Sequence, residues 1–143
     1  MDIIEKSLEI ALNAYSGQKD KAGQTYILHP LRLMGKMDTD TERAVALLHD
    51  VIEDSDHTAD HLLAQGIPSN IVDAVQCLSK IKGENYEQFI KRVKTNSLAT
   101  KVKIADIEDN INILRLEIIS EKDLLRVAKY HHAWKLLKST HEN

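Results

Sequence analysis

The chain of 143 residues has one cysteine, no long hydrophobic run and no excess of positive charge. The single Cys77 excludes an intrachain disulfide and argues against a thiolate metal site. A net charge of −3 gives no electrostatic support for nucleic acid or a membrane surface as a partner. Residues 1–6 lack the basic start of a secretory leader, and no apolar run approaches transmembrane length. These absences predict a protein of the reducing cytoplasm.

Strand-like alternation and internal repeats are also missing, whereas apolar residues recur throughout at helical spacing. The fold class expected is therefore all-α, a compact single domain over residues 1–143 with a frayed tail at 139–143. Gly17 suits a left-handed helix C-cap, and capping boxes open helices at Thr39 and Ser120. About eight helices are predicted, over residues 4–15, 28–37, 39–54, 59–65, 69–78, 86–93, 98–118 and 121–137.

Residues 44–54, Ala-Val-Ala-Leu-Leu-His-Asp-Val-Ile-Glu-Asp, carry the most unusual pattern. Read as one helix, His49 and Glu53 share a face, as do Asp50 and Asp54. Three carboxylates lie near the C-terminal end of an apolar helix, where the macrodipole disfavours negative charge. A solvated acidic helix end explains Glu53 and Asp54 well. It explains His49 and Asp50 poorly, because apolar residues surround them, and a bound cation would resolve both the repulsion and the burial.

Two further polar residues lie in apolar surroundings. His29 precedes Pro30 at the entrance of a helix, where a histidine alone is more often a structural cap. Asp106 lies in an apolar row of the helix predicted over residues 98–118, and an ion pair or a backbone partner would also explain it. Together with His49 and Asp50 they could form a nitrogen and oxygen site for Mn²⁺, Fe²⁺ or Zn²⁺. Such a metal lowers the pKa of water and polarises a phosphoryl oxygen.

The order His…His-Asp…Asp resembles the HD-domain metal-dependent phosphohydrolases. Three longer stretches, residues 17–30, 46–54 and 102–110, are similar to the hydrolase domain of the RelA/SpoT family. The single-domain small alarmone hydrolases are nearest in size. The resemblance runs over about residues 8–137, and the Glu-Asp pair three residues after His-Asp makes it specific.

The resemblance implies a reaction and a set of roles. The family hydrolyses the 3′-diphosphate of ppGpp or pppGpp, the alarmones of the stringent response, and releases pyrophosphate with GDP or GTP. A chain of this length is expected to hold no synthetase region. The implied metal ligands, usually for Mn²⁺, are His29, His49, Asp50 and Asp106, and the implied pair that positions or deprotonates water is Glu53 and Asp54.

The implied partner is a small nucleotide, and its contacts are less firmly indicated. Asn110 matches a nucleotide-contacting Asn of the family. Lys21 and Lys103 are candidates for contact with phosphate or base. Lys19 and Lys101 could also reach phosphates, although solvated surface lysines are the better interpretation of those two.

Two departures from the family pattern lie in the ligand rim. Asp20 stands where the family usually has an Arg that packs on guanine, which removes a cationic stacking surface. The run Asn-Ile-Asn-Ile-Leu at residues 110–114 replaces the Asn-Leu-Arg-Thr-Leu type. The pattern predicts retained hydrolysis with an altered or relaxed substrate, such as ppApp. A 5′-nucleotidase, an NADPH phosphatase and a non-catalytic nucleotide sensor remain alternatives.

Overall fold

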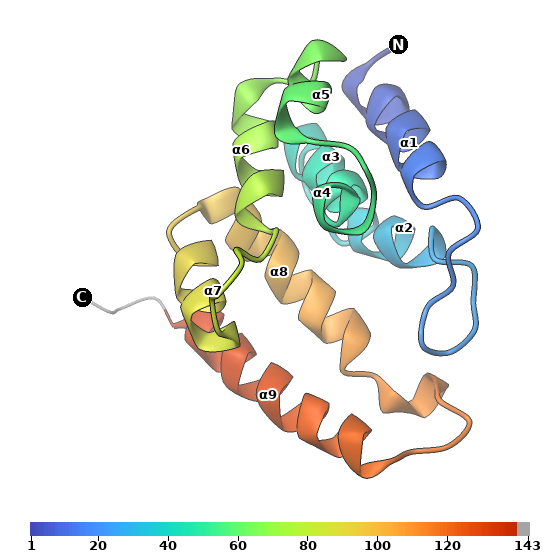
Figure 1. Cartoon of the computed structure of the whole chain (residues 1–143), viewed down its shortest axis with the longest axis vertical. Helices are drawn as coiled ribbons and strands as arrows, with labels where there is room; N and C mark the ends of the chain where they lie inside the picture. The colour runs from blue at the N-terminus through green and yellow to red at the C-terminus, as the bar shows by residue number, and fades with distance from the viewer. Residues whose placement is uncertain (140–143) are drawn as a thin grey trace.

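A computed structural model describes residues 1–139, and residues 140–143 of the predicted frayed tail lie outside the described part. The described residues form nine α-helices and one 3-10 turn, with no strand beyond an isolated bridge between Lys19 and Thr25 (Figure 1). The all-α prediction is confirmed. The helices are α1 (Ile3–Ala14), α2 (Leu28–Met34), α3 (Asp40–Leu48), α4 (Val51–Asp54), α5 (Ala59–Ala64), α6 (Ser69–Cys77), α7 (Tyr86–Val93), α8 (Ser97–Asn110) and α9 (Glu121–Lys138), and the 3-10 turn η1 is Ile113–Arg115.

Local capping explains why most helices begin and end where the sequence predicts. Thr39 and Ser120 each accept a hydrogen bond from the third helical N–H, and the residue at that position caps back, so both capping boxes are confirmed. Asn96 caps α8 in a simpler way. Gly17 has a φ of +80°, the left-handed conformation expected after the first helix.

Two predicted helices differ from the structure. The helix over residues 39–54 is broken into α3 and α4, which accounts for nine helices in residues 1–139 instead of eight. The helix over residues 98–118 stops at Asn110. Beyond it the Asn112 side chain accepts a hydrogen bond from the Leu114 N–H, which competes with helical backbone bonding. Leu114 and Ile118, which the sequence placed in that helix, are 90% and 78% exposed, so they are not part of a buried helix face.

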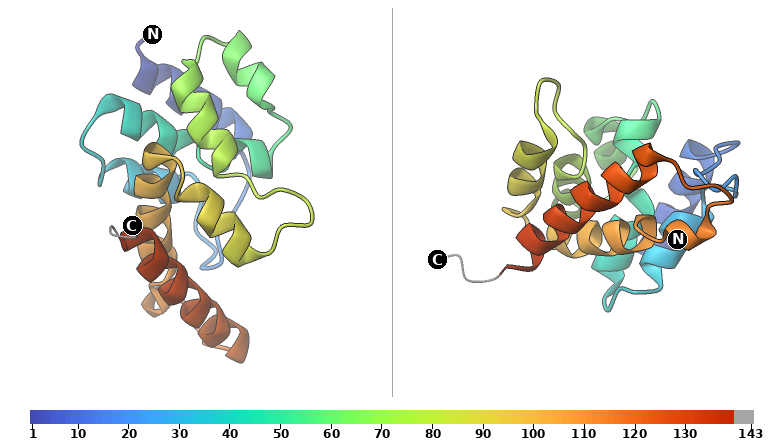
Figure 2. Two further views of the ribbon diagram at one scale, coloured as in Figure 1. Left: turned by 90° about the vertical axis from the view of Figure 1, so that its left-hand side faces the viewer. Right: turned by 90° about the horizontal axis from the view of Figure 1, so that it is seen from below.

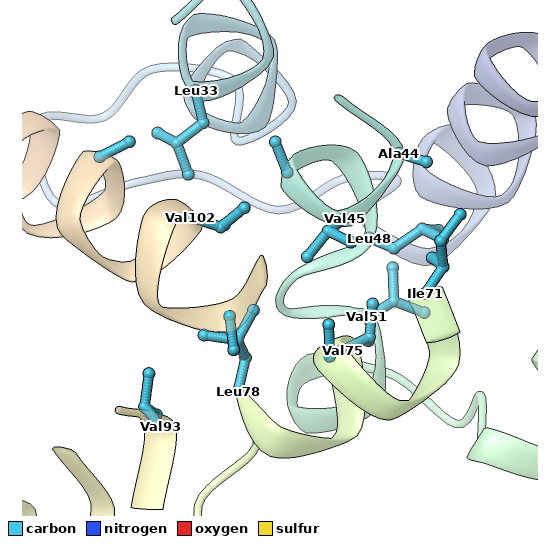
Figure 3. Packing of buried hydrophobic residues seen from close by; sticks show 14 of the residues in the cluster. Leu33, Ala44, Val45, Leu48, Val51, Ile71, Val75, Leu78, Val93 and Val102 are labelled. Atoms are coloured by element: carbon cyan, nitrogen blue, oxygen red, sulfur yellow. The ribbon is translucent and has the colours of Figure 1, made fainter. Parts of the chain in front are cut away.

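Helix α3 lies at the centre of the molecule, where it packs against α1, α2, α6 and α8. Its residues Ala44–Leu48 are completely buried, and Figure 3 shows Val45 and Leu48 among side chains from the surrounding helices. Helix α9 packs against α7 and α8, and its first turns extend beyond the rest of the molecule (Figure 2). No helix within residues 1–139 is both long and apolar enough to cross a membrane. This packing carries the end of α3, and with it His49, into the interior.

Candidate metal centre and nucleotide cavity

The break between α3 and α4 brings His49 and Asp50 together. Consecutive side chains on an ideal helix diverge by about 100°. Asp50 leaves helical geometry, with a φ of −109° and a ψ of 8°, and its Oδ2 lies 3.2 Å from His49 Nε2. Tyr15 stabilises the break, because its hydroxyl accepts from the Asp50 N–H at 3.1 Å and donates to the Leu47 carbonyl at 3.3 Å. The continuous helix expected over this segment is therefore wrong, and its two adjacent polar residues share one centre.

Three helices supply the atoms of this centre. One ring nitrogen from His29 on α2, one from His49 after α3 and one carboxylate oxygen from Asp106 on α8 lie within 4.8 Å of one another. All three residues are at most 5% exposed. His29 Nε2 is 2.8 Å from Asp106 Oδ1. Asp50 lies at the edge of the set, where its Oδ2 also accepts a hydrogen bond from the Tyr26 hydroxyl.

Hydrogen bonds on the outer ring nitrogens fix both histidines. His49 Nδ1 donates to the Ala46 carbonyl at 2.8 Å, so its Nε2 carries the inward lone pair of the neutral ring. His29 Nδ1 donates to Asp109 Oδ2 at 2.6 Å. Arg32 clamps the same carboxylate from outside, with Nε and Nη2 at 2.8 and 2.9 Å from its oxygens. Carboxylates and carbonyls in this outer position orient metal-binding histidines.

The inward atoms fit a divalent cation. His49 Nε2 is buried and has no hydrogen-bond partner among the described residues, yet it faces oxygens of Asp50 and Asp106 at 3.2 and 3.5 Å. Lone pairs at these distances repel unless a cation or a proton lies between them. Burial works to lower the pKa of His29, but hydrogen bonds with Asp106 and Asp109 outweigh it and raise that pKa. The pKa of His49 is raised well above its ordinary value, because the charges of Asp50 and Asp106 outweigh burial.

A cavity of about 240 Å³ opens from this centre to the surface. Asp54 lines it, and burial together with the charges of Asp50 and Glu53 raises the pKa of Asp54 to about 6. Glu53 is not part of the lining; its Oε2 accepts from the Lys80 backbone N–H at 3.0 Å. The lining also includes four cationic side chains, which we call the basic wall: Lys19, Lys21, Arg115 and Arg126, of which Arg115 is paired with Asp20 and Arg126 with Asp123. The cavity therefore joins a buried donor set to a cationic wall.

The sequence is similar to long nucleotide-metabolising proteins, although no family model matches it. It is 31% identical over 128 residues to a guanosine-3′,5′-bis(diphosphate) 3′-pyrophosphohydrolase of Vibrio cholerae, covering 80% of this chain and 18% of the relative. It is 29% identical over 137 residues to a protein of the same name from Aquifex aeolicus, covering 88% and 19%. The chain is a homologue of the RelA/SpoT proteins. It spans about a fifth of the length of these curated relatives.

The fold agrees with this relationship to the RelA/SpoT proteins. A solved structure described as a metazoan ortholog of SpoT that hydrolyses ppGpp superposes with a TM-score of 0.78 and 19% identity. The alignment covers 100% of this chain and 89% of that one. The resemblance expected from the sequence motifs is thereby confirmed. A GTP pyrophosphokinase of Myxococcus xanthus is also 30% identical, over 90% of this chain and 19% of its own length. The names of RelA/SpoT relatives thus cover both hydrolysis and synthesis, so the activity has to be argued from the site.

Of the predicted nucleotide contacts in this RelA/SpoT homologue, some line the cavity and others are paired with carboxylates outside it. Lys21 and Asn110 line the cavity, and Asn110 Nδ2 also donates to Asp106 Oδ1 at 3.0 Å. Lys103 is paired with Asp106 Oδ2 at 2.8 Å, its side chain is 15% exposed, and it lies outside the cavity lining. Lys101 is paired with Asp38 and Glu42 instead.

Sequence reasoning missed several residues that support the centre. Asp109 follows Asp106 by three residues on α8, and Arg32 follows His29 by three residues on α2. That matched spacing on two helices that pack together is the signal that could have paired them. Tyr15 and the cavity residue Arg115 gave no comparable local signal.

Proposed function

We propose that this chain is a metal-dependent hydrolase of nucleotide polyphosphates, a single hydrolase domain over residues 1–143 in which the family resemblance runs over about residues 8–137. The reaction proposed is release of pyrophosphate from the 3′ position of ppGpp or pppGpp, or of an adenine analogue. The observation that carries the proposal is that the buried donor set opens into a cavity whose lining also includes cationic side chains. A nucleotide with two phosphorylated positions matches such a site at both ends.

His29, His49, Asp106 and Asp50 would hold the ion. Their two nitrogens and two carboxylates suit a first-row divalent metal, and we propose Mn²⁺ as its identity. Such an ion supplies Lewis-acid chemistry, which polarises a phosphoryl oxygen and makes water more acidic. Lone Cys77, without a disulfide partner in the sequence, fits the reducing cytoplasm as the location.

Asp54 is proposed to take the proton from the attacking water. It lines the cavity close to the donor set, and its raised pKa of about 6 leaves it ionised but still basic near neutral pH. Glu53 is proposed to act with Asp54 as a positioning residue. Its bond to the Lys80 backbone fixes the end of α4, which carries Asp54.

Cationic and amide side chains would orient the substrate. Lys21 and Lys19 line the cavity and have no ion-pair partner among the described residues, so we propose that they contact phosphates. Asn110 can contact the ribose or a phosphate while it remains bonded to Asp106. Lys103 is proposed to act differently, by balancing the charge of Asp106 inside the protein.

A product analysis across a substrate panel tests this function. The protein is incubated with ppGpp, ppApp, NADPH and nucleoside 5′-monophosphates, with Mn²⁺ and with a chelator. The proposal expects metal-dependent pyrophosphate from ppGpp or ppApp. Inorganic phosphate from NADPH or from the monophosphates as the main product would instead support a phosphatase. Binding of ppGpp without turnover of any compound would support the sensor alternative.

A further inference from the structure

One ion pair joins the two chain segments that form the basic wall of the cavity. Asp20 lies in the loop between α1 and α2, and Arg115 is the last residue of η1, 95 positions later. Asp20 Oδ2 accepts from Arg115 Nη1 at 3.3 Å. Both segments lie at the right of the molecule in Figure 1 and in the right-hand view of Figure 2. Both residues line the cavity.

The loop around Asp20 has a defined shape. Asp20 Oδ1 accepts from the backbone N–H groups of Ala22 and Gln24 at 2.8 and 2.9 Å. The Asp20 N–H donates to the Gln24 carbonyl at 2.9 Å, and Gly23 turns the chain with a φ of +81°. The Asp20 side chain is 10% exposed. Its carboxylate is therefore occupied on both oxygens and does not present a free negative charge to a ligand.

Arg115 has donors to spare. Its side chain is 24% exposed, and its Nε is buried without a hydrogen-bond partner in the described part of the chain. By contrast, Arg32 uses two nitrogens on Asp109, and Arg92 binds Glu84 and two backbone carbonyls. A guanidinium with one bond has a planar face and several N–H groups left for a ligand.

The cationic residues of the basic wall differ in whether a carboxylate already balances their charge. Lys19 and Lys21 are exposed, line the cavity and have no ion-pair partner among the described residues, so they are available to phosphates. The charge of Arg115 is balanced by Asp20, so what it offers is mainly a flat surface. Leu116 and Tyr130 line the same cavity and add apolar and aromatic surface. A planar, partly apolar group such as a nucleobase matches these surroundings better than a phosphate does.

We propose that Arg115, held in place by Asp20, contacts the base of the bound nucleotide. The inference rests on the proposed function only in taking the ligand to be a nucleotide. It assigns the base-contacting guanidinium to η1, while the loop between α1 and α2 supplies its carboxylate partner Asp20. Stacking of this kind tolerates different bases, so guanine and adenine nucleotides should bind within about tenfold of each other.

Equilibrium binding of two matched ligands tests the assignment. The probes are GDP and ribose 5-diphosphate, which is the same molecule without its base, measured by calorimetry on the full chain with Mn²⁺. Base stacking is worth a factor of about 10 to 100 by alanine substitution, so Arg115→Ala should weaken GDP binding by that factor. The affinity of the same variant for ribose 5-diphosphate should change less than about threefold, because this ligand lacks the stacked base. Arg115→Lys keeps the ion pair but removes the planar guanidinium, so it should weaken GDP binding as much as Arg115→Ala does.

Two further variants complete the test. Lys21→Ala should weaken the binding of GDP and of ribose 5-diphosphate equally. Asp20→Asn, whose amide oxygen can still accept from the Ala22 and Gln24 N–H groups, should weaken GDP binding in the wild-type background and have no further effect when Arg115 is already alanine. An equal loss for both probes in Arg115→Ala, no loss for either, or wild-type protein that prefers GDP no more than ribose 5-diphosphate would each overturn the assignment. Failure to hydrolyse ppGpp would not, because the binding measurement needs no turnover.

Discussion

Replacing Asp109 with alanine should weaken metal binding, although Asp109 is not one of the proposed metal ligands. The substitution removes the acceptor that fixes the His29 ring, at 2.6 Å from its Nδ1. Hydrogen bonds from His29 and Arg32 outweigh burial and hold the pKa of Asp109 far below its ordinary value, so an ionised carboxylate is lost. The His29 side chain is 4% exposed, which leaves water poor access to the freed N–H. The ring would then adopt other tautomers and orientations.

In metalloproteins, loss of a residue that hydrogen-bonds the outer nitrogen of a metal-binding histidine lowers metal affinity by about 10- to 100-fold, or about 1.4 to 2.8 kcal/mol. We expect a loss of this size for Asp109→Ala. Titration of the metal-free protein with Mn²⁺, followed by calorimetry, measures this directly and needs no substrate. Circular dichroism and the unfolding temperature show whether the variant is folded.

Arg32→Ala is the matched control for this prediction. Its guanidinium contacts the same carboxylate, but its side chain is 38% exposed and does not touch the histidine through any recorded bond. The Asp109–His29 bond survives this change, so Mn²⁺ affinity should fall by less than about threefold. Wild-type Mn²⁺ affinity in a folded Asp109→Ala variant would refute the view that Asp109 orients His29 for metal binding.

Four other outcomes follow from the geometry. Asp54→Asn should lower kcat by about 10²- to 10⁴-fold, whereas Glu53→Gln, whose amide oxygen can still accept from the backbone, should lose less than about tenfold; equal losses would contradict the separate roles. The pKa of Asp54 is raised to about 6, so wild-type kcat should fall as the pH drops through that value, and a bound cation would move this limb lower. Raised pKa values at His29 and His49 mean that protons compete with metal, so Mn²⁺ affinity measured by calorimetry should fall as the pH is lowered, by up to about tenfold per pH unit for each proton displaced. Leu48→Ala removes a side chain with 0% exposure and should cost about 2 to 5 kcal/mol in urea unfolding, whereas unchanged stability would contradict the central place of α3.

Local signals in the sequence predicted most of the fold. The capping boxes at Thr39 and Ser120 and the left-handed Gly17 depend on neighbours within a few residues, and all three are present. The burial of His49 and Asp106 could also be predicted, since each lies in an apolar helical row. That His29 joins them was expected from the family motif, and the structure brings the three together.

Features that depend on distant partners could not be predicted from local spacing. The break at Asp50 is supported by the Tyr15 hydroxyl, which lies 35 residues away. The pairing of Asp20 with Arg115 joins positions 95 apart, so the sequence alone indicates only that Asp20 removes a positive charge from the loop. Leu114 was expected in a continuing helix, but it is exposed in the 3-10 turn after α8. An apolar residue at helical spacing therefore does not establish that the helix continues.

The proposed hydrolysis depends above all on release of pyrophosphate from ppGpp, with ppApp measured in parallel. Wild-type protein and Asp106→Ala are compared with Mn²⁺ and with a chelator, and pyrophosphate and GDP are quantified together. The proposed site predicts equal amounts of the two products from wild-type protein with Mn²⁺, and none with the chelator or from the variant. Pyrophosphate formation that persists in Asp106→Ala, or wild-type protein that binds Mn²⁺ and nucleotide but releases pyrophosphate from neither ppGpp nor ppApp, would contradict it.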